Sequence, residues 1–239
     1  MDKQHFPLEI GKYYHIYNRG INGCNLFYEE KNYYYFLEKY AHYMSGVLDT
    51  FAYCLMPNHF HLLVRVKDFN TALNLTGLED LSGLTTNLKD LENPIGFKNL
   101  SGLTTQNPLG LDKSGLHHPD KFVSKKFSDM FNSYTKSFNK VQQRTGSLFE
   151  TPFRRIAVES DAYFTSLLWY IHYNPQKHGF VADFRDYPYT SFHSILSSQP
   201  SKLAREEVLQ WFGSKDKFLE FHGGRQNDLA INKLLIEFD

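Results

Sequence analysis

Residues 47–66 decide the fold and read Val47-Leu-Asp-Thr-Phe-Ala-Tyr-Cys-Leu-Met-Pro-Asn-His-Phe-His-Leu-Leu-Val-Arg-Val66. Branched and aromatic residues dominate both halves of this stretch, which is typical of β-strands. Between the halves stands Pro57-Asn58, a turn dipeptide, because proline fixes φ and asparagine favours turns. The stretch therefore predicts an antiparallel hairpin with strands over Val47–Met56 and His59–Val66.

Two more strands and two helices are predicted around this hairpin. Aromatic and branched runs predict strands, whereas apolar residues that recur every three or four positions predict helices. The expected strands are Lys12–Asn18 and Leu148–Val158, and the expected helices are Glu29–Met44 and the segment that carries Phe127, Phe131, Tyr134 and Phe138. The order strand, helix, strand, strand, helix, strand predicts an α+β ferredoxin-like sandwich, an antiparallel sheet with helices on one face.

An extra helix is expected after the sandwich. Ser160 is a favourable N-cap, so the helix begins at Asp161, and Pro175 ends it by disfavouring helical geometry at the preceding residue. On this helix Tyr163, Tyr170 and Asn174 form a polar stripe beside the apolar face. Since Tyr170 and Asn174 are one turn apart, about 6 Å along the axis, the helix would offer a phenol and an amide oxygen to one site.

Residues 72–120 differ in composition from the rest of the chain. This segment has one aromatic residue, Phe97, although the chain holds 21 Phe, 16 Tyr and 2 Trp. Its sequence Leu81-Ser-Gly-Leu-Thr-Thr86 returns at Leu100, and two copies are too few for a solenoid. We interpret 72–120 as a flexible low-complexity insertion that divides a main domain of residues 1–71 and 121–196, and residues 197–239 as a C-terminal extension.

Charge is spread unevenly along the chain. Its 26 Lys and Arg balance 26 Asp and Glu, and a net charge of zero taken alone argues against a nucleic-acid binder. However, residues 121–200 hold ten basic and six acidic residues, whereas the insertion holds three basic and six acidic residues. The neutral total therefore conceals a basic segment.

Other features of the sequence predict a cytoplasmic protein. No stretch approaches eighteen apolar residues, so no membrane span is expected. The first residues have neither the basic nor the apolar region of a signal peptide. Only Cys24 and Cys54 occur, which indicates a reducing compartment, and neither has a Cys-x-x-Cys partner for a zinc finger.

The predicted hairpin carries two histidines at its turn. His59 and His61 are two residues apart on a strand, so both side chains point to one face and lie close enough to bind the same metal ion. The spacing alone fits equally well a histidine that is packed in the core and hydrogen-bonded there. The turn before the pair and Leu62-Leu63-Val64 behind it favour a metal site held by a rigid strand.

Four motifs occur in one order along the chain. They are Met56-Pro-Asn-His-Phe-His-Leu-Leu-Val64, Tyr134-Thr-Lys-Ser-Phe-Asn139, Gly146-Ser-Leu-Phe149 and Tyr170-Ile-His-Tyr-Asn-Pro-Gln-Lys-His178. Together they resemble the single-tyrosine HUH transposase superfamily and, within it, the REP-associated tyrosine transposases. The resemblance covers roughly Tyr13–Leu196 apart from the insertion, which is not part of that pattern.

This resemblance implies a metal-dependent transesterase that cleaves and rejoins single-stranded DNA. His59 and His61 match the HUH histidines, and Tyr170 matches the nucleophile that forms a 5′-phosphotyrosine intermediate. Asn174 stands where relatives place a polar third ligand, often Gln. Two imidazoles, an amide oxygen and open positions suit Mg²⁺ or Mn²⁺, with Zn²⁺ as an alternative.

The expected partner is single-stranded DNA with hairpin or palindromic elements, bound by a monomer or homodimer in the bacterial cytoplasm, in association with the nucleoid. The basic residues expected to contact DNA are Arg19, Lys125, Lys136, Lys140, Arg144, Arg154 and Arg155. Two alternatives remain: a catalytically inactive, domesticated regulator that binds DNA hairpins, and a metal-dependent phosphodiesterase that uses water.

Overall fold

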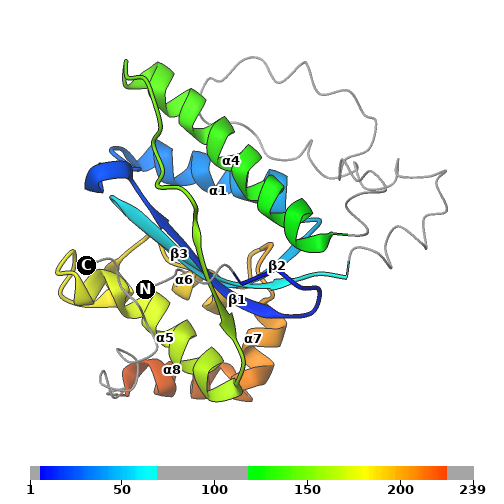
Figure 1. Ribbon diagram of the computed structural model, residues 1–239. Helices are drawn as coiled ribbons and strands as arrows, with labels where there is room; N and C mark the ends of the chain where they lie inside the picture. The colour runs from blue at the N-terminus through cyan, green and yellow to red at the C-terminus, as the bar shows by residue number, and fades with distance from the viewer. Residues whose placement is uncertain (1–5, 69–117, 225–239) are drawn as a thin grey trace.

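The computed structural model describes residues 6–68 and 118–224 and is built on a four-stranded antiparallel sheet in the order β2-β3-β1-β4. The strands are β1 Tyr13–Arg19, β2 Leu48–Met56, β3 His59–Val66 and β4 Arg154–Val158. Helices α1 Glu30–Met44 and α4 Pro119–Val141 connect them and cover one face (Figure 1). The predicted ferredoxin-like α+β sandwich is confirmed.

Further helices cover the other face of the sheet (Figure 1). They are α5 Asp161–Lys177, α6 Phe192–Leu196, α7 Arg205–Phe212 and α8 Lys215–Gly223, and 3-10 turns occur at η1 Ile21–Gly23 and η3 Phe184–Asp186. Since both faces are covered, β3 is buried almost throughout: Leu62 and Val64 belong to the core under α1 and α4, whereas Leu63 belongs to the core under α5.

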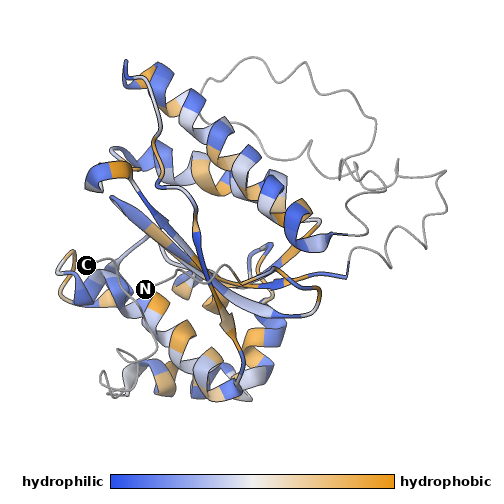
Figure 2. Cartoon of the chain, viewed as in Figure 1, coloured by the Kyte–Doolittle hydropathy of each residue, from blue (hydrophilic) through white to orange (hydrophobic). Residues whose placement is uncertain are grey.

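Helix α4 shows the amphipathic pattern that the sequence predicts. Phe127, Phe131, Tyr134 and Phe138 are all buried in the core that this helix shares with α1 and the sheet. Figure 2 shows hydrophilic residues along the outer side of the helix. The lysines of α4 are therefore presented away from the sheet.

Three prolines account for the larger differences between the predicted and observed bounds, and the bounds of β1, α1 and β2 differ by one residue. Pro119 lies in the first turn of α4, where its missing N–H leaves no helical hydrogen bond unmade, so this helix includes the last two residues of the predicted insertion. Pro152 cannot donate to a β-ladder, and β4 begins only at Arg154. Pro175 lies in the last turn of α5, so it removes a single hydrogen bond and the helix continues to Lys177. The rest of the predicted insertion lies outside the described residues.

A chain of buried hydrogen bonds joins α5 to α8. His222 Nδ1 bonds the Phe218 carbonyl oxygen at 2.8 Å, so Nδ1 carries the proton and Nε2 accepts from His172 Nδ1 at 3.0 Å. His172 Nε2 then accepts from Ser191 Oγ at 2.7 Å, and Ser191 Oγ accepts from the Tyr53 amide at 2.9 Å. Residues 197–224 of the predicted extension are therefore anchored to the helix that carries Tyr170.

We expect α8 to contribute directly to the stability of the fold. Phe218 is fully buried, so Phe218→Ala should lower the free energy of unfolding by about 3–5 kcal/mol. Its neighbour Leu219 is 40% exposed, and Leu219→Ala should change it by less than about 1 kcal/mol. Urea denaturation measures both variants. Equal, small effects would show that α8 unfolds independently of the sheet.

Candidate active site

The register of the sheet places both predicted metal ligands on the face that α5 covers. Tyr17 of β1 lies opposite His61, and Arg19 lies opposite His59. The two imidazole rings are 5.2 Å apart between centroids and nearly perpendicular, at 86°. Both residues are buried, with 7% of His59 and 4% of His61 exposed. The strand therefore brings the two rings together, as their spacing predicts.

One nitrogen of each ring is engaged by a neighbouring side chain. His59 Nδ1 lies 2.7 Å from Asn58 Oδ1, in the hairpin turn. His61 Nδ1 lies 2.9 Å from Nε2 of His15, two residues before Tyr17 on β1. His15 was not among the predicted site residues, although its spacing from Tyr17 places both on one face of a strand.

The turn that carries Asn58 is held by the turn that follows β1. The Gly20 amide donates to the Asn58 carbonyl at 2.8 Å. A Cβ at Gly20 would lie 1.9 Å from the carbonyl oxygen of Cys24, so only glycine fits there. The ends of β1 and β3 are thus fixed against each other at the site.

Helix α5 brings Tyr170 to this pair. The Tyr170 ring lies 6.0 Å from the His61 ring, edge to face, and only 2% of the residue is exposed. Asn174 follows one turn later and is fully buried. Neither its side-chain oxygen nor its nitrogen has a hydrogen-bond partner among residues 6–68 and 118–224. Such an unsatisfied buried amide is costly to the fold.

Two residues that the sequence analysis left without a role also lie here. The His178 ring is 5.3 Å from the His59 ring, and Lys177 Nζ lies 5.0 Å from the centre of the Tyr170 ring. Seven residues separate Lys177 from Tyr170, which is two helical turns, so both lie along one stripe of α5. The sequence analysis ended the helix at Pro175, so it did not place Lys177 on the same helical stripe as Tyr170.

Burial keeps His15 and His61 uncharged. It lowers the pKa of His15 from 6.5 to about 3 and the pKa of His61 well below 6.5. The neighbouring rings of His15, His59 and His178 lower the pKa of His61 further, as does the Lys177 ammonium. Neutral imidazole is the form that binds a metal ion, so the environment favours that form at neutral pH.

The predicted DNA-contacting residues divide between the two faces of the sheet. Arg19 and Arg154 flank Glu150, at 2.6 and 3.7 Å, on the side of the histidines. Burial raises the pKa of the Tyr17 phenol, whereas the charge of Arg154 and a hydrogen bond from it lower this pKa by less. These two guanidinium groups therefore lie on the same face of the sheet as His59 and His61.

The other five lie on or beside α4, across the sheet from α5. Lys125, Lys136 and Lys140 are exposed, and Arg144 packs over Phe138 while donating to the Ser147 carbonyl. Arg155 is buried, with 4% of its side chain exposed, and pairs with Asp120 at 3.1 Å. Strand alternation turns Arg155 into the α4 side, whereas Arg154 faces the site, so the contact of Arg155 with DNA has no support from its position.

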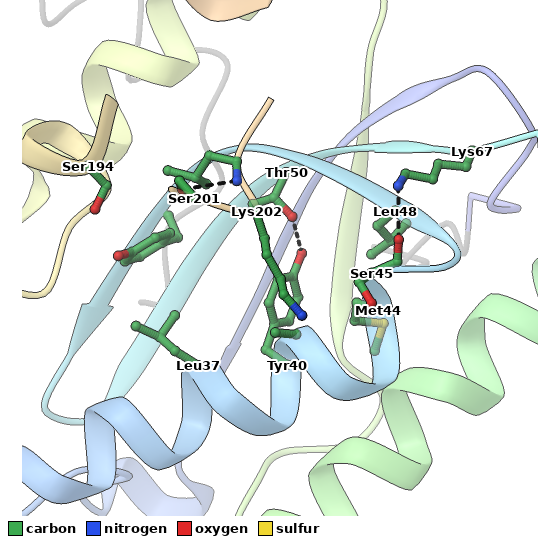
Figure 3. Close-up of a pocket in the computed structure, with 13 residues that line it drawn as sticks. Leu37, Tyr40, Met44, Ser45, Leu48, Thr50, Lys67, Ser194, Ser201 and Lys202 are labelled. Atoms are coloured by element: carbon green, nitrogen blue, oxygen red, sulfur yellow. Dashed lines mark hydrogen bonds between the residues drawn. The ribbon is translucent and has the colours of Figure 1, made fainter. Parts of the chain in front are cut away.

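The groove in Figure 3, with a volume of about 450 Å³, lies elsewhere. It is bounded by α1, β2 and the segment around Leu203. A hydrogen bond of 2.8 Å joins the hydroxyl groups of Tyr40 and Thr50 in its lining. Its lining contains none of the predicted site residues.

Within the described ranges no group of three or more His, Cys, Asp or Glu side chains is placed to hold a metal ion. No described helix is long and apolar enough to cross a membrane.

Comparison with known proteins supports the resemblance seen in the motifs. No protein-family model matches the chain. A curated Haemophilus influenzae protein named as a REP-associated tyrosine transposase is 24% identical over 155 residues, 63% of this chain and 62% of that protein. The solved structure of a REP-associated tyrosine transposase bound to a REP hairpin covers 84% of this chain and 89% of its own, with a TM-score of 0.52 and 13% identity. The chain is similar in sequence and in fold to REP-associated tyrosine transposases. It spans less than two thirds of the curated relative, and the structural likeness confirms the fold.

Four of the buried histidines predict a loss of stability in mild acid. An unfolded histidine takes up a proton near pH 6.5, whereas burial lowers the folded pKa of His15, His61, His172 and His222 below that value. The unfolded state therefore binds more protons, and stability falls as the pH drops below about 6.5. The loss per pH unit is at most about 1.4 kcal/mol for each of these histidines. Urea denaturation with EDTA tests this, and equal stability at both pH values would contradict it.

The buried amide of Asn174 leads to a second prediction about stability. Replacing an unsatisfied buried amide by an apolar side chain of similar size removes a desolvation penalty, so Asn174→Leu should raise the free energy of unfolding by about 1–3 kcal/mol without metal. Thermal unfolding in EDTA measures the change. Destabilisation would show that the amide contributes to the fold itself.

Proposed function

We propose that this chain is a transesterase that cleaves and rejoins hairpin-containing single-stranded DNA, with Tyr170 as the nucleophile. The observation that carries this proposal is the position of the Tyr170 ring, 6.0 Å from His61 and one turn before the unsatisfied amide of Asn174. The motif likeness and the hairpin bound in the similar structure support DNA of this kind as the substrate.

The residues present fit a divalent cation. His59, His61 and Asn174 would hold it, because imidazole nitrogens and an amide oxygen that lacks a partner among the described residues are suitable donors. Mg²⁺ or Mn²⁺ bound there would polarise the scissile phosphate and stabilise its developing charge. Arg19 and Arg154 would hold the neighbouring phosphates on the same side of the sheet.

In the cleavage step the Tyr170 oxygen attacks phosphorus and the bond from phosphorus to the 3′ oxygen breaks. The phenol proton leaves to solvent, the 3′ oxygen takes up a proton, and a 5′-phosphotyrosine conserves the ester energy. Attack of a 3′-hydroxyl on this ester reverses the step and rejoins a strand. Because Tyr170 is 2% exposed, the DNA must displace the groups that cover it, among them the exposed Lys177 side chain.

The burial of Tyr170 is also the observation that favours the second candidate, a regulator that binds DNA hairpins without cutting them. A phosphodiesterase that activates water would use the histidines and leave Tyr170 idle. The three functions differ in the fate of the DNA and of Tyr170.

A denaturing gel with labelled hairpin DNA and Mn²⁺ separates these functions. The unmodified protein should form a covalent adduct, and Tyr170→Phe should reduce it by about 10³-fold or more because no other group can replace the nucleophile. Tyr163→Phe, on the same helix, is the matched control and should keep the adduct. Cleavage that persists in Tyr170→Phe would favour water attack, and binding without cleavage by the unmodified protein would favour the regulator.

The same gel tests the histidines. His59→Ala and His61→Ala should each abolish cleavage, since each removes a proposed ligand, while hairpin affinity measured by fluorescence anisotropy stays within about threefold. Unchanged cleavage in either variant would exclude that histidine from the site.

A further inference from the structure

The proton position on His59 can be derived from its neighbour. An amide oxygen accepts hydrogen bonds and does not donate them, so the 2.7 Å contact between Asn58 Oδ1 and His59 requires a proton on His59 Nδ1. A neutral imidazole carries one proton. Nε2 of His59 therefore holds the lone pair and is the nitrogen that would bind a cation.

His61 has the same arrangement with a different neighbour. Its Nδ1 is 2.9 Å from His15 Nε2, so Nε2 is again the nitrogen left for a cation. For Nε2 to offer a lone pair, Nδ1 must carry the proton and donate it to His15. His15 must then hold its own proton on Nδ1 and accept through Nε2.

His15 is fixed in the position that this role requires. It is 2% exposed, and its ring stacks on Tyr17 at 4.7 Å and lies nearly parallel to His61 at 5.1 Å. Its Nδ1 has no hydrogen-bond partner in residues 6–68 and 118–224. Because a buried unpaired group is costly, packing and the bond to His61 must hold this ring in place.

We propose that Asn58 and His15 are the positioning residues of the cation site, each accepting the Nδ1–H of one histidine so that both Nε2 atoms point to the same ion. This role rests on the proposed function of His59 and His61 as ligands. Partners of this kind orient ligating histidines and fix their tautomer. Asn58 comes from the turn of the hairpin and His15 from β1, so each of these two elements supplies one support.

Two pairs of variants at Asn58 and His15 distinguish two contributions of these residues: accepting a hydrogen bond from the ligand's Nδ1–H, and packing against the ligand. Asn58→Asp and His15→Gln keep an acceptor oxygen within reach of Nδ1, and Mn²⁺ affinity measured by calorimetry should stay within about threefold or rise with the added carboxylate. Asn58→Leu and His15→Leu remove the acceptor at similar volume and should weaken Mn²⁺ binding about 10- to 100-fold. Circular dichroism confirms that each variant is folded.

NMR of the metal-free protein with ¹⁵N-labelled histidine provides an independent readout, because ring nitrogen shifts distinguish the two tautomers. His59 and His61, assigned through their alanine variants, should both carry the proton on Nδ1, and each Leu variant should shift its own partner toward the Nε2–H form. Nε2–H tautomers in the unmodified protein, unchanged Mn²⁺ affinity in the Leu variants, or no Mn²⁺ binding at all would overturn the proposal. Mn²⁺ binding and tautomers as expected, without a DNA adduct, would contradict the proposed function alone.

Discussion

The pairing of β1 with β3 is the constraint on which the rest of the site depends. Its register sets Tyr17 opposite His61 and so places His15, the diagonal neighbour, within 2.9 Å of that ring. Because side chains alternate along a strand, a shift of one residue would turn both histidines into the core under α1 and α4. The apolar residues of β3 on both faces oppose such a shift, so the packing of the sheet also fixes the chemistry at its end.

Helix α5 completes the site at a cost in stability. Its apolar face packs on β2 and β3, and the His172–His222 chain holds it from the other side. Yet Asn174 is buried with both amide atoms unsatisfied among the described residues, and Tyr170 is buried beside the neutral imidazole of His61. A helix selected for stability alone would carry an apolar residue at position 174. This local violation of good packing is typical of positions kept for binding.

Much of this arrangement could be predicted from the sequence because it follows from local periodicity. The hairpin at residues 47–66, the amphipathic α4 and the common face of His59 and His61 all have a strict spacing, and the structure has them as expected. What could not be predicted depends on contacts between distant segments. His15 meets His61 only through the strand register, and His178 meets His59 only because α5 passes Pro175. Arg155 was assigned to DNA from its charge, which does not reveal the face of β4 on which a side chain lies.

The central claim is that Tyr170 itself becomes linked to DNA. Peptide mass spectrometry after incubation with hairpin DNA, Mn²⁺ and nuclease tests it most directly, since trypsin releases residues 156–177 as one peptide that also contains Tyr163 and Tyr173. We predict that fragmentation places a 5′-phosphonucleotide on Tyr170 and on neither of the other two tyrosines. Cut DNA with no adduct on this peptide, or an adduct on Tyr163 or Tyr173, would contradict the account.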